Sequence, residues 1–161
     1  MHIPLRLAVL LAVSAALVAA CDDSPTEPGD VQLSFETVLN NSYSGITGPE
    51  LLSIRDAGEW PRIWERLHAG LSPVPPLPAV DFDRRMLLLA ALGSRANGCF
   101  AVEITDIALK RSGEIEIEVM EDEPGPACGC TQAVTNPVHV VSLERVDASE
   151  TFRARRQQLS C

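Results

Sequence analysis

Alternation of apolar and polar residues dominates the chain beyond residue 30. An apolar residue at every second position indicates a strand with one buried face, whereas a continuous apolar stretch indicates a strand buried on both faces. The strands predicted in this way are 31–36, 51–55, 86–92, 100–104, 114–119 and 138–143. The two-residue phase slips between Ile104 and Ile107, which predicts a β-bulge near Thr105 and Asp106.

A single segment has helical periodicity. Large apolar residues recur at spacings of three and four between Asp56, which can cap the first turn, and Gly70, which ends the helix. They are Trp60, Ile63, Trp64 and Leu67. This spacing places both tryptophans on one face, which we expect to pack against the sheet. The segment 71–78 then contains four prolines and is predicted to be an extended connector.

A turn follows the most apolar strand. The segment 93–98 predicts a hairpin, because Asn97 and Gly98 are a pair that readily adopts the positive φ that tight hairpins need. The polar segment 153–158 is expected to end the fold loosely unless Cys161 anchors it. The pattern as a whole predicts a mainly β (α+β) fold, with an antiparallel sheet of about five to seven strands and one helix packed on it.

The first 30 residues differ from the rest of the chain. Residues 1–20 combine Arg6 with an uncharged apolar stretch shorter than the roughly 20 residues of a transmembrane helix, which predicts a secretory signal peptide. Small residues then precede Cys21, and this resembles the bacterial lipobox, which implies that Cys21 is lipidated and becomes the mature N-terminus. Residues 21–30 are acidic and contain Pro and Gly, so they predict a flexible tether. Residues 31–161 remain as a single globular domain.

Charge restricts the possible partners. Without the signal peptide, which contains one of the 13 basic residues and none of the 22 acidic residues, the formal net charge of the chain is −10. Such a balance argues against nucleic acid, which needs a clustered basic face. It argues equally against electrostatic docking on anionic lipid, so membrane attachment is expected to come from acyl chains on Cys21. The expected location is the bacterial cell envelope, at the inner or the outer membrane, with the domain exported.

Four cysteines remain once Cys21 is assigned to lipidation, and an even number in an exported chain indicates disulfides with three possible connectivities. They are Cys99, Cys128, Cys130 and Cys161. A bond between Cys128 and Cys130 would close a strained small ring, whereas an extended Cys-Gly-Cys directs both side chains to the same side. We therefore expect one of these two cysteines to pair with Cys99 and the other with Cys161.

The same residues fit metal, thiol and hydrolytic chemistry poorly. A zinc site at Cys128 and Cys130 would need two more ligands, and His68 and His139 do not stand at finger-like spacing. A thiol-redox site favours Cys-x-x-Cys at a helix N-terminus, which the neighbouring prolines prevent. His139 has no Gly-x-Ser-x-Gly nucleophile to serve, and the acidic segment 114–123 lacks a calcium loop and is expected to be a solvated strand face. No cofactor is expected.

Several short motifs run through the domain in a fixed order. They are Ser44-Gly-Ile46, 59–64, 80–82, Met86, Leu92-Gly93, Asn97–Phe100, 121–126 and 135–139. In this order they resemble the PrcB-type C-terminal domain, a family named after an accessory lipoprotein subunit of a bacterial surface protease complex. The resemblance covers most of residues 44–141, and Cys99 stands where the family pattern usually has glycine. It implies a non-catalytic, membrane-tethered protein that binds or stabilises a partner.

Partner binding in the envelope is the function we expect. The domain would bind or stabilise another envelope protein, as an accessory subunit of a surface or periplasmic protease complex. The expected contact residues are Asn97, Gly98, Phe100 and His139. The alternative is a small periplasmic hydrolase or thiol-dependent enzyme, which would require a nucleophile beside a His139 of shifted pKa.

Overall fold

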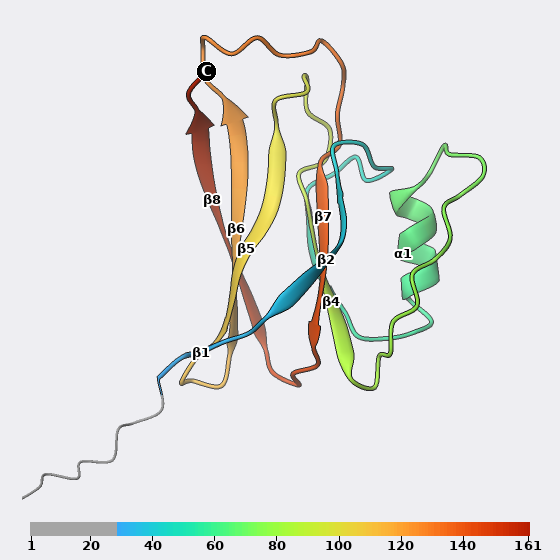
Figure 1. The fold of residues 1–161 in the computed structure, drawn as a ribbon, viewed down its shortest axis with the longest axis vertical. Helices are drawn as coiled ribbons and strands as arrows, with labels where there is room; N and C mark the ends of the chain where they lie inside the picture. Colours follow the sequence, from blue (N-terminus) through green and yellow to red (C-terminus); the bar gives the residue numbers. More distant parts are fainter. Residues whose placement is uncertain (1–28) are drawn as a thin grey trace, which may run out of the picture.

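The alternating segments form eight strands, and the segment of helical period forms one helix, in a computed structural model that describes residues 29–161. The strands are β1 (Val31–Gln32), β2 (Phe35–Asn41), β3 (Glu50–Ile54), β4 (Arg85–Ala91), β5 (Ala101–Leu109), β6 (Ile115–Pro124), β7 (Val138–Glu144) and β8 (Glu150–Leu159). The helix α1 spans Trp60–Leu67. Figure 1 shows these elements arranged in three layers, two sheets and the helix.

The mainly β class is confirmed, and its strands divide between two four-stranded sheets rather than forming one. Sheet A has the order β1-β5-β6-β8, and sheet B has the order β2-β7-β4-β3. Neighbouring strands are antiparallel except β6 and β8, which run parallel. The second sheet is needed because β4 is apolar on both faces: α1 covers one face, and sheet A covers the other (Figure 1).

Two apolar cores hold the three layers together. The core between the sheets contains Met86 of β4 and Ile117 of β6, both fully buried. The core between sheet B and the helix contains Leu87 of β4 together with Trp60 and Trp64, which confirms that both tryptophans pack in the core. Within residues 29–161 no helix is long and apolar enough to cross a membrane.

The proline-rich connector lies along α1. The indole Nε1 of Trp60 donates a hydrogen bond to the carbonyl oxygen of Pro78 at 3.0 Å, and that of Trp64 donates to Pro75 at 2.9 Å. The sequence predicted Asp56 as the helix cap, but the N-cap is Glu59. The side chain of Asp56 closes the preceding turn instead. The connector is thus fastened to the helix at two carbonyl groups.

The hairpin predicted at 93–98 does not form. β4 belongs to sheet B and β5 to sheet A, so this segment carries the chain from one sheet to the other. The only positive φ in it is at Gly93, 71°, and neither Asn97 nor Gly98 has one. The segment bonds to the later loop 125–137 rather than to its own flanking strands, which removes the need for a tight turn.

The polar C-terminal segment forms a ten-residue strand, β8, along β6. Arginines of β8 pair with glutamates of β6, so the acidic strand face that we expected to be solvated is neutralised along the ladder. The pairs are Arg153–Glu116, Arg155–Glu118 at 2.9 Å and Arg156–Glu121 at 3.2 Å. Hydrogen bonds from Arg153, and secondarily from Lys110, lower the pKa of the half-buried Glu116. The tail is ordered because these pairs and the Cys161 disulfide hold it.

Gly45 lies where the loop between β2 and β3 meets the end of α1. Its N–H donates to the carbonyl of Leu67 at 2.9 Å, and an added Cβ would lie 2.1 Å from the oxygen of Arg66 and 2.6 Å from the Cβ of Ala69. We expect Gly45→Ala to lower the free energy of unfolding by about 2 kcal/mol, because backbone must shift to relieve the overlap. Chemical denaturation beside Gly48→Ala, whose Cβ would meet nothing within 4 Å, tests this, and equal midpoints would contradict it.

Candidate functional site

Two loops, 94–100 and 125–137, form one end of the sandwich, and we call them the stapled platform. Loop 125–137 crosses over this end from β6 in sheet A to β7 in sheet B (Figure 1). The two disulfides are Cys99–Cys130 and Cys128–Cys161, with Cα–Cα distances of 5.5 Å and 4.9 Å. The first joins the two loops, and the second joins the crossing loop to the residue beyond β8. The structure thereby selects one of the pairings that the Cys-Gly-Cys spacing left open.

Backbone hydrogen bonds reinforce the two disulfides of the stapled platform. Arg95 and Thr135 exchange a pair of bonds at 2.8 Å and 3.0 Å, and the N–H of Gly98 donates to the carbonyl of Thr131 at 3.1 Å. The buried Thr135 also donates its hydroxyl to the carbonyl of Asn97 at 2.8 Å. The loops therefore present a surface whose backbone is already fixed.

Three of the four expected contact residues lie on the stapled platform. Gly98 is exposed, whereas Asn97 and Phe100 are half-buried. The side-chain oxygen of Asn97 accepts the N–H of Cys99 at 3.0 Å, and the ring of Phe100 packs on the core between the sheets, with the guanidinium of Arg95 5.8 Å from its centroid. Asn97 and Phe100 thus shape the platform and leave little side-chain surface for a partner.

Sequence reasoning missed the most exposed apolar residue of this end. Val134 is 67 % exposed on the stapled platform, and Tyr43 is 60 % exposed in the neighbouring loop. That loop is tied to the platform by Asn136, whose backbone N–H donates to the carbonyl of Ser42 and whose amide donates to that of Ser44, both at 2.9 Å. A single apolar residue in an irregular polar segment has no periodicity, so the pattern did not reveal it.

The fourth residue, His139, is buried and cannot contact a partner. It is 2 % exposed, and its Nδ1 accepts the backbone N–H of Ile104 at 2.9 Å. Because Nδ1 must carry a lone pair, the proton is on Nε2, which donates to the hydroxyl of Thr37 at 3.0 Å. Burial lowers the pKa of His139, and the charge of Glu103 opposes this only partly, so the ring is neutral.

His139 connects the two sheets at the β-bulge. The ladder between β5 and β6 changes register between Ile104 and Asp106, which confirms the predicted bulge. The N–H of Ile104 in sheet A bonds the histidine of β7 in sheet B. His139 therefore has a structural role, and not the partner-contact role expected from the sequence.

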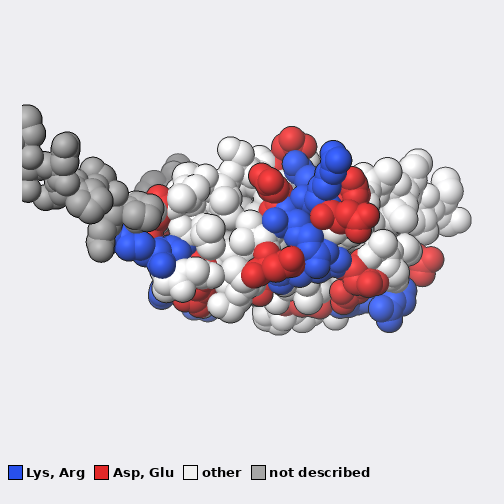
Figure 2. Space-filling model, turned by 90° about the horizontal axis from the view of Figure 1, so that it is seen from below, with Lys and Arg blue, Asp and Glu red and all other residues white. Residues whose placement is uncertain are grey.

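The opposite end of the sandwich carries the start of the described chain and many charged residues. The carboxylate of Asp30 binds Lys110 at 2.6 Å and accepts the backbone N–H of Arg111 at 3.1 Å, which fixes the beginning of β1 beside the β5–β6 turn. Figure 2 looks onto this end and shows basic side chains interleaved with acidic ones. Cys21, the expected lipidation site, lies outside the described residues.

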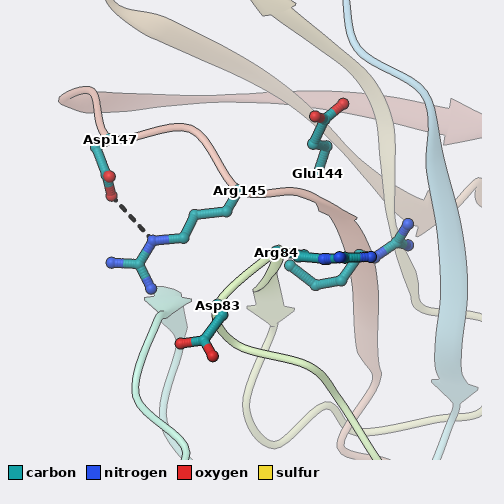
Figure 3. A pocket seen from close by; sticks show the side chains of 6 residues that line it. Asp83, Arg84, Glu144, Arg145 and Asp147 are labelled. Carbon is teal, nitrogen blue, oxygen red and sulfur yellow. Dashed lines mark hydrogen bonds and ion pairs between the residues drawn. The ribbon is translucent and has the colours of Figure 1, made fainter.

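A shallow pocket of about 580 Å³ lies at this charged end. Its lining residues are Asp83, Arg84, Arg85, Glu144, Arg145 and Asp147. Arg145 bonds Asp147 at 3.1 Å and donates to the carbonyls of Arg55 and Phe82, whereas Arg84 extends away from both (Figure 3). These bonds hold neighbouring loops together, and the pocket has equal numbers of basic and acidic residues and no side-chain nucleophile of the Ser, Cys or Thr type.

The cysteines and histidines on which the enzymatic alternative depends have structural partners within the described residues. All four cysteines within residues 29–161 form disulfides, so none is a free thiol. In the same range no group of three or more His, Cys, Asp and Glu side chains is placed to hold a metal ion. The buried histidines bond to neighbouring groups: His139 to Thr37 and Ile104, and His68 through Nδ1 to the carbonyl of Trp64 at 2.9 Å.

Comparison with known proteins identifies the central part of the domain. The model of the PrcB C-terminal family matches residues 86–144, which contain β4, β5, β6 and β7, the middle strands of both sheets. The motifs noted at 44–82 precede this match. Searches of the curated proteins and of the solved structures found no match. The segment 86–144 of this chain is therefore similar to the PrcB C-terminal family.

Proposed function

We propose that this chain is a lipid-anchored, non-catalytic envelope protein that binds a partner protein through the stapled platform. The observation that supports this is the placement of the two ends. Asp30 is fixed at one end of the sandwich, and the platform forms the other. A tether from Cys21 to Asp30 would span about 30 Å when extended. Acyl chains on Cys21 would therefore turn the charged end towards the membrane and the platform away from it.

The stapled platform has properties that suit a docking surface. Its two disulfides and its backbone bonds fix the loops before binding, so little conformational entropy would be lost on association. Val134 supplies an exposed apolar contact. Because the PrcB family takes its name from an accessory subunit of a protease complex, the partner we propose is a component of such a complex, which this domain stabilises or positions.

Photo-crosslinking in cells tests both the anchor and the docking end. A photoreactive residue at Ala96 or Val134, both exposed on the stapled platform, is expected to form an adduct with one envelope protein. The same residue at Arg84 or Asp147, whose side chains are 86 % and 77 % exposed at the charged end, serves as the matched control and should not form that adduct. Adducts from the control positions alone would contradict docking at the platform.

A second part of this experiment tests the lipid anchor. The Cys21→Ser chain should leave the membrane fraction and lose the adduct, because the acyl chains supply its only proposed attachment to the membrane. A Cys21→Ser chain that remains in the membrane fraction would refute lipidation at Cys21, whichever positions form adducts.

A further inference from the structure

The proline-rich connector 71–78 shows a three-residue pattern of burial. Pro75 and Pro78 are half-buried, whereas Pro73, Val74, Pro76 and Leu77 are exposed. The buried positions are those whose carbonyl groups accept the indole N–H groups of α1. A period of three is that of a polyproline II helix, in which residues three apart share a face.

The backbone of residues 73–78, which follow the cis peptide bond between Ser72 and Pro73, is restricted to this conformation by its own residues. Each proline fixes its φ near −65°, and the residue before a proline is excluded from the helical region. Val74, Pro75 and Leu77 all precede prolines, so they are extended. The two indole N–H groups bond to the carbonyl groups of Pro75 and Pro78, which are three residues apart. These bonds fix the rotation of the segment about its axis. Which face is turned outward is therefore determined by Trp60 and Trp64.

The outward face is apolar. Val74 and Leu77, three residues apart, are 45 % and 44 % exposed, and Leu71 before them is 55 % exposed. Residues 71–80 contain no charged side chain, although the chain as a whole is 22 % charged. A hollow of about 200 Å³ lies between Val74, Leu77 and the α1 residues Pro61 and Glu65. An extended spacer needs no outward apolar side chains at regular spacing, so this face has the chemistry of a ligand.

We propose that residues 73–78 are a preformed polyproline II ligand for an aromatic-lined groove on a partner protein. Such grooves read Pro-x-x-Pro, and Pro73 and Pro76 are the exposed pair at that spacing, with Val74 and Leu77 following each of them. The conformation is already fixed against α1, so binding costs little ordering entropy. The absence of charge in 71–80 favours a groove that recognises shape and apolar surface. This inference is independent of the lipid anchor and of the stapled platform.

Nuclear magnetic resonance of the full chain tests this proposal with a defined set of probes, a panel of isolated SH3 and WW domains. The chain has two tryptophans, so its two indole N–H resonances report directly on the bonds to Pro75 and Pro78. At least one probe is expected to shift both indole resonances in a saturable way. If no domain of the panel shifts them, the proposal is wrong.

Three variants distinguish recognition of this face from nonspecific binding. Leu77→Asp places a charge in the contact and should weaken binding at least about tenfold, the amount expected for losing one buried apolar side chain. Leu51→Asp introduces the same change at a leucine of β3 that is equally exposed, 44 %, and should bind like the parent. The exposed Pro76→Ala should also bind more weakly while the fold, monitored by circular dichroism, is kept. Unchanged affinity in Leu77→Asp would overturn the assignment.

Discussion

Replacing Cys128 and Cys161 together with serine is expected to lower the free energy of unfolding by about 3–4 kcal/mol. The disulfide closes a loop with a sequence separation of 33 residues, and the chain-entropy model gives that loss for a loop of this length. The bond also fastens the end of β8, an edge strand whose outward residues are polar. Chemical denaturation at constant pH, under non-reducing conditions, measures the change.

Control variants distinguish the effect of losing the disulfide from the effect of changing residues near it. Ser160→Ala, an exposed change next to Cys161, should leave the denaturation midpoint unaltered. Replacing Cys99 and Cys130 instead should cost a similar amount, because their separation is 31 residues. In the Cys128/Cys161 variant, hydrogen exchange should accelerate most in the last residues of β8. A variant that unfolds at the same denaturant concentration as the parent would show that this bond does not constrain the chain in solution.

How far the fold could be predicted depended on whether its signals were local. The continuous apolar stretch of β4 revealed a strand buried on both faces, and the spacing of Trp60 and Trp64 revealed the helix that covers one of them. The number of sheets could not be predicted, because it depends on which distant strands pair. β8 has a short apolar face, on which Phe152 packs against the core between the sheets, and its arginines lie beside glutamates of the distant β6.

The candidate site shows the same division between local and distant information. The number of cysteines predicted two disulfides, and the slip in the two-residue spacing predicted the bulge. The structure contains both features. The pattern did not reveal that His139 satisfies the N–H at the bulge, because Ile104 lies in sheet A and His139 in sheet B, and the two residues meet only when the sheets pack. The hairpin was predicted wrongly for the same reason: Asn97-Gly98 is a local turn signal, and pairing with the distant Thr131 and Thr135 overrides it.

Removal of the His139 side chain is expected to lower the free energy of unfolding by about 3 kcal/mol in His139→Ala. The N–H of Ile104 would lose its acceptor, which costs about 1–3 kcal/mol for a buried donor, and the missing ring would leave a cavity. His139→Asn is the matched control, since its side-chain oxygen can occupy the position of Nδ1 and accept the same N–H. Chemical denaturation should therefore rank the parent above the asparagine variant and the asparagine variant above alanine. Equal stability of the two variants would contradict the role of the Ile104 bond.

The same histidine predicts a dependence of stability on pH. Burial lowers the pKa of His139 in the folded protein below its ordinary value of 6.5, so the unfolded chain takes up its proton first as the pH falls. The parent should therefore lose stability as the pH falls from about 6.5 through the folded pKa, and this contribution should be constant below it. His139→Asn has no proton to bind at this site, so its deficit relative to the parent should narrow over that interval. Because all other titrating groups are shared, a deficit that stays constant between pH 8 and pH 5, about the range in which histidines titrate, would show that burial does not hold His139 neutral.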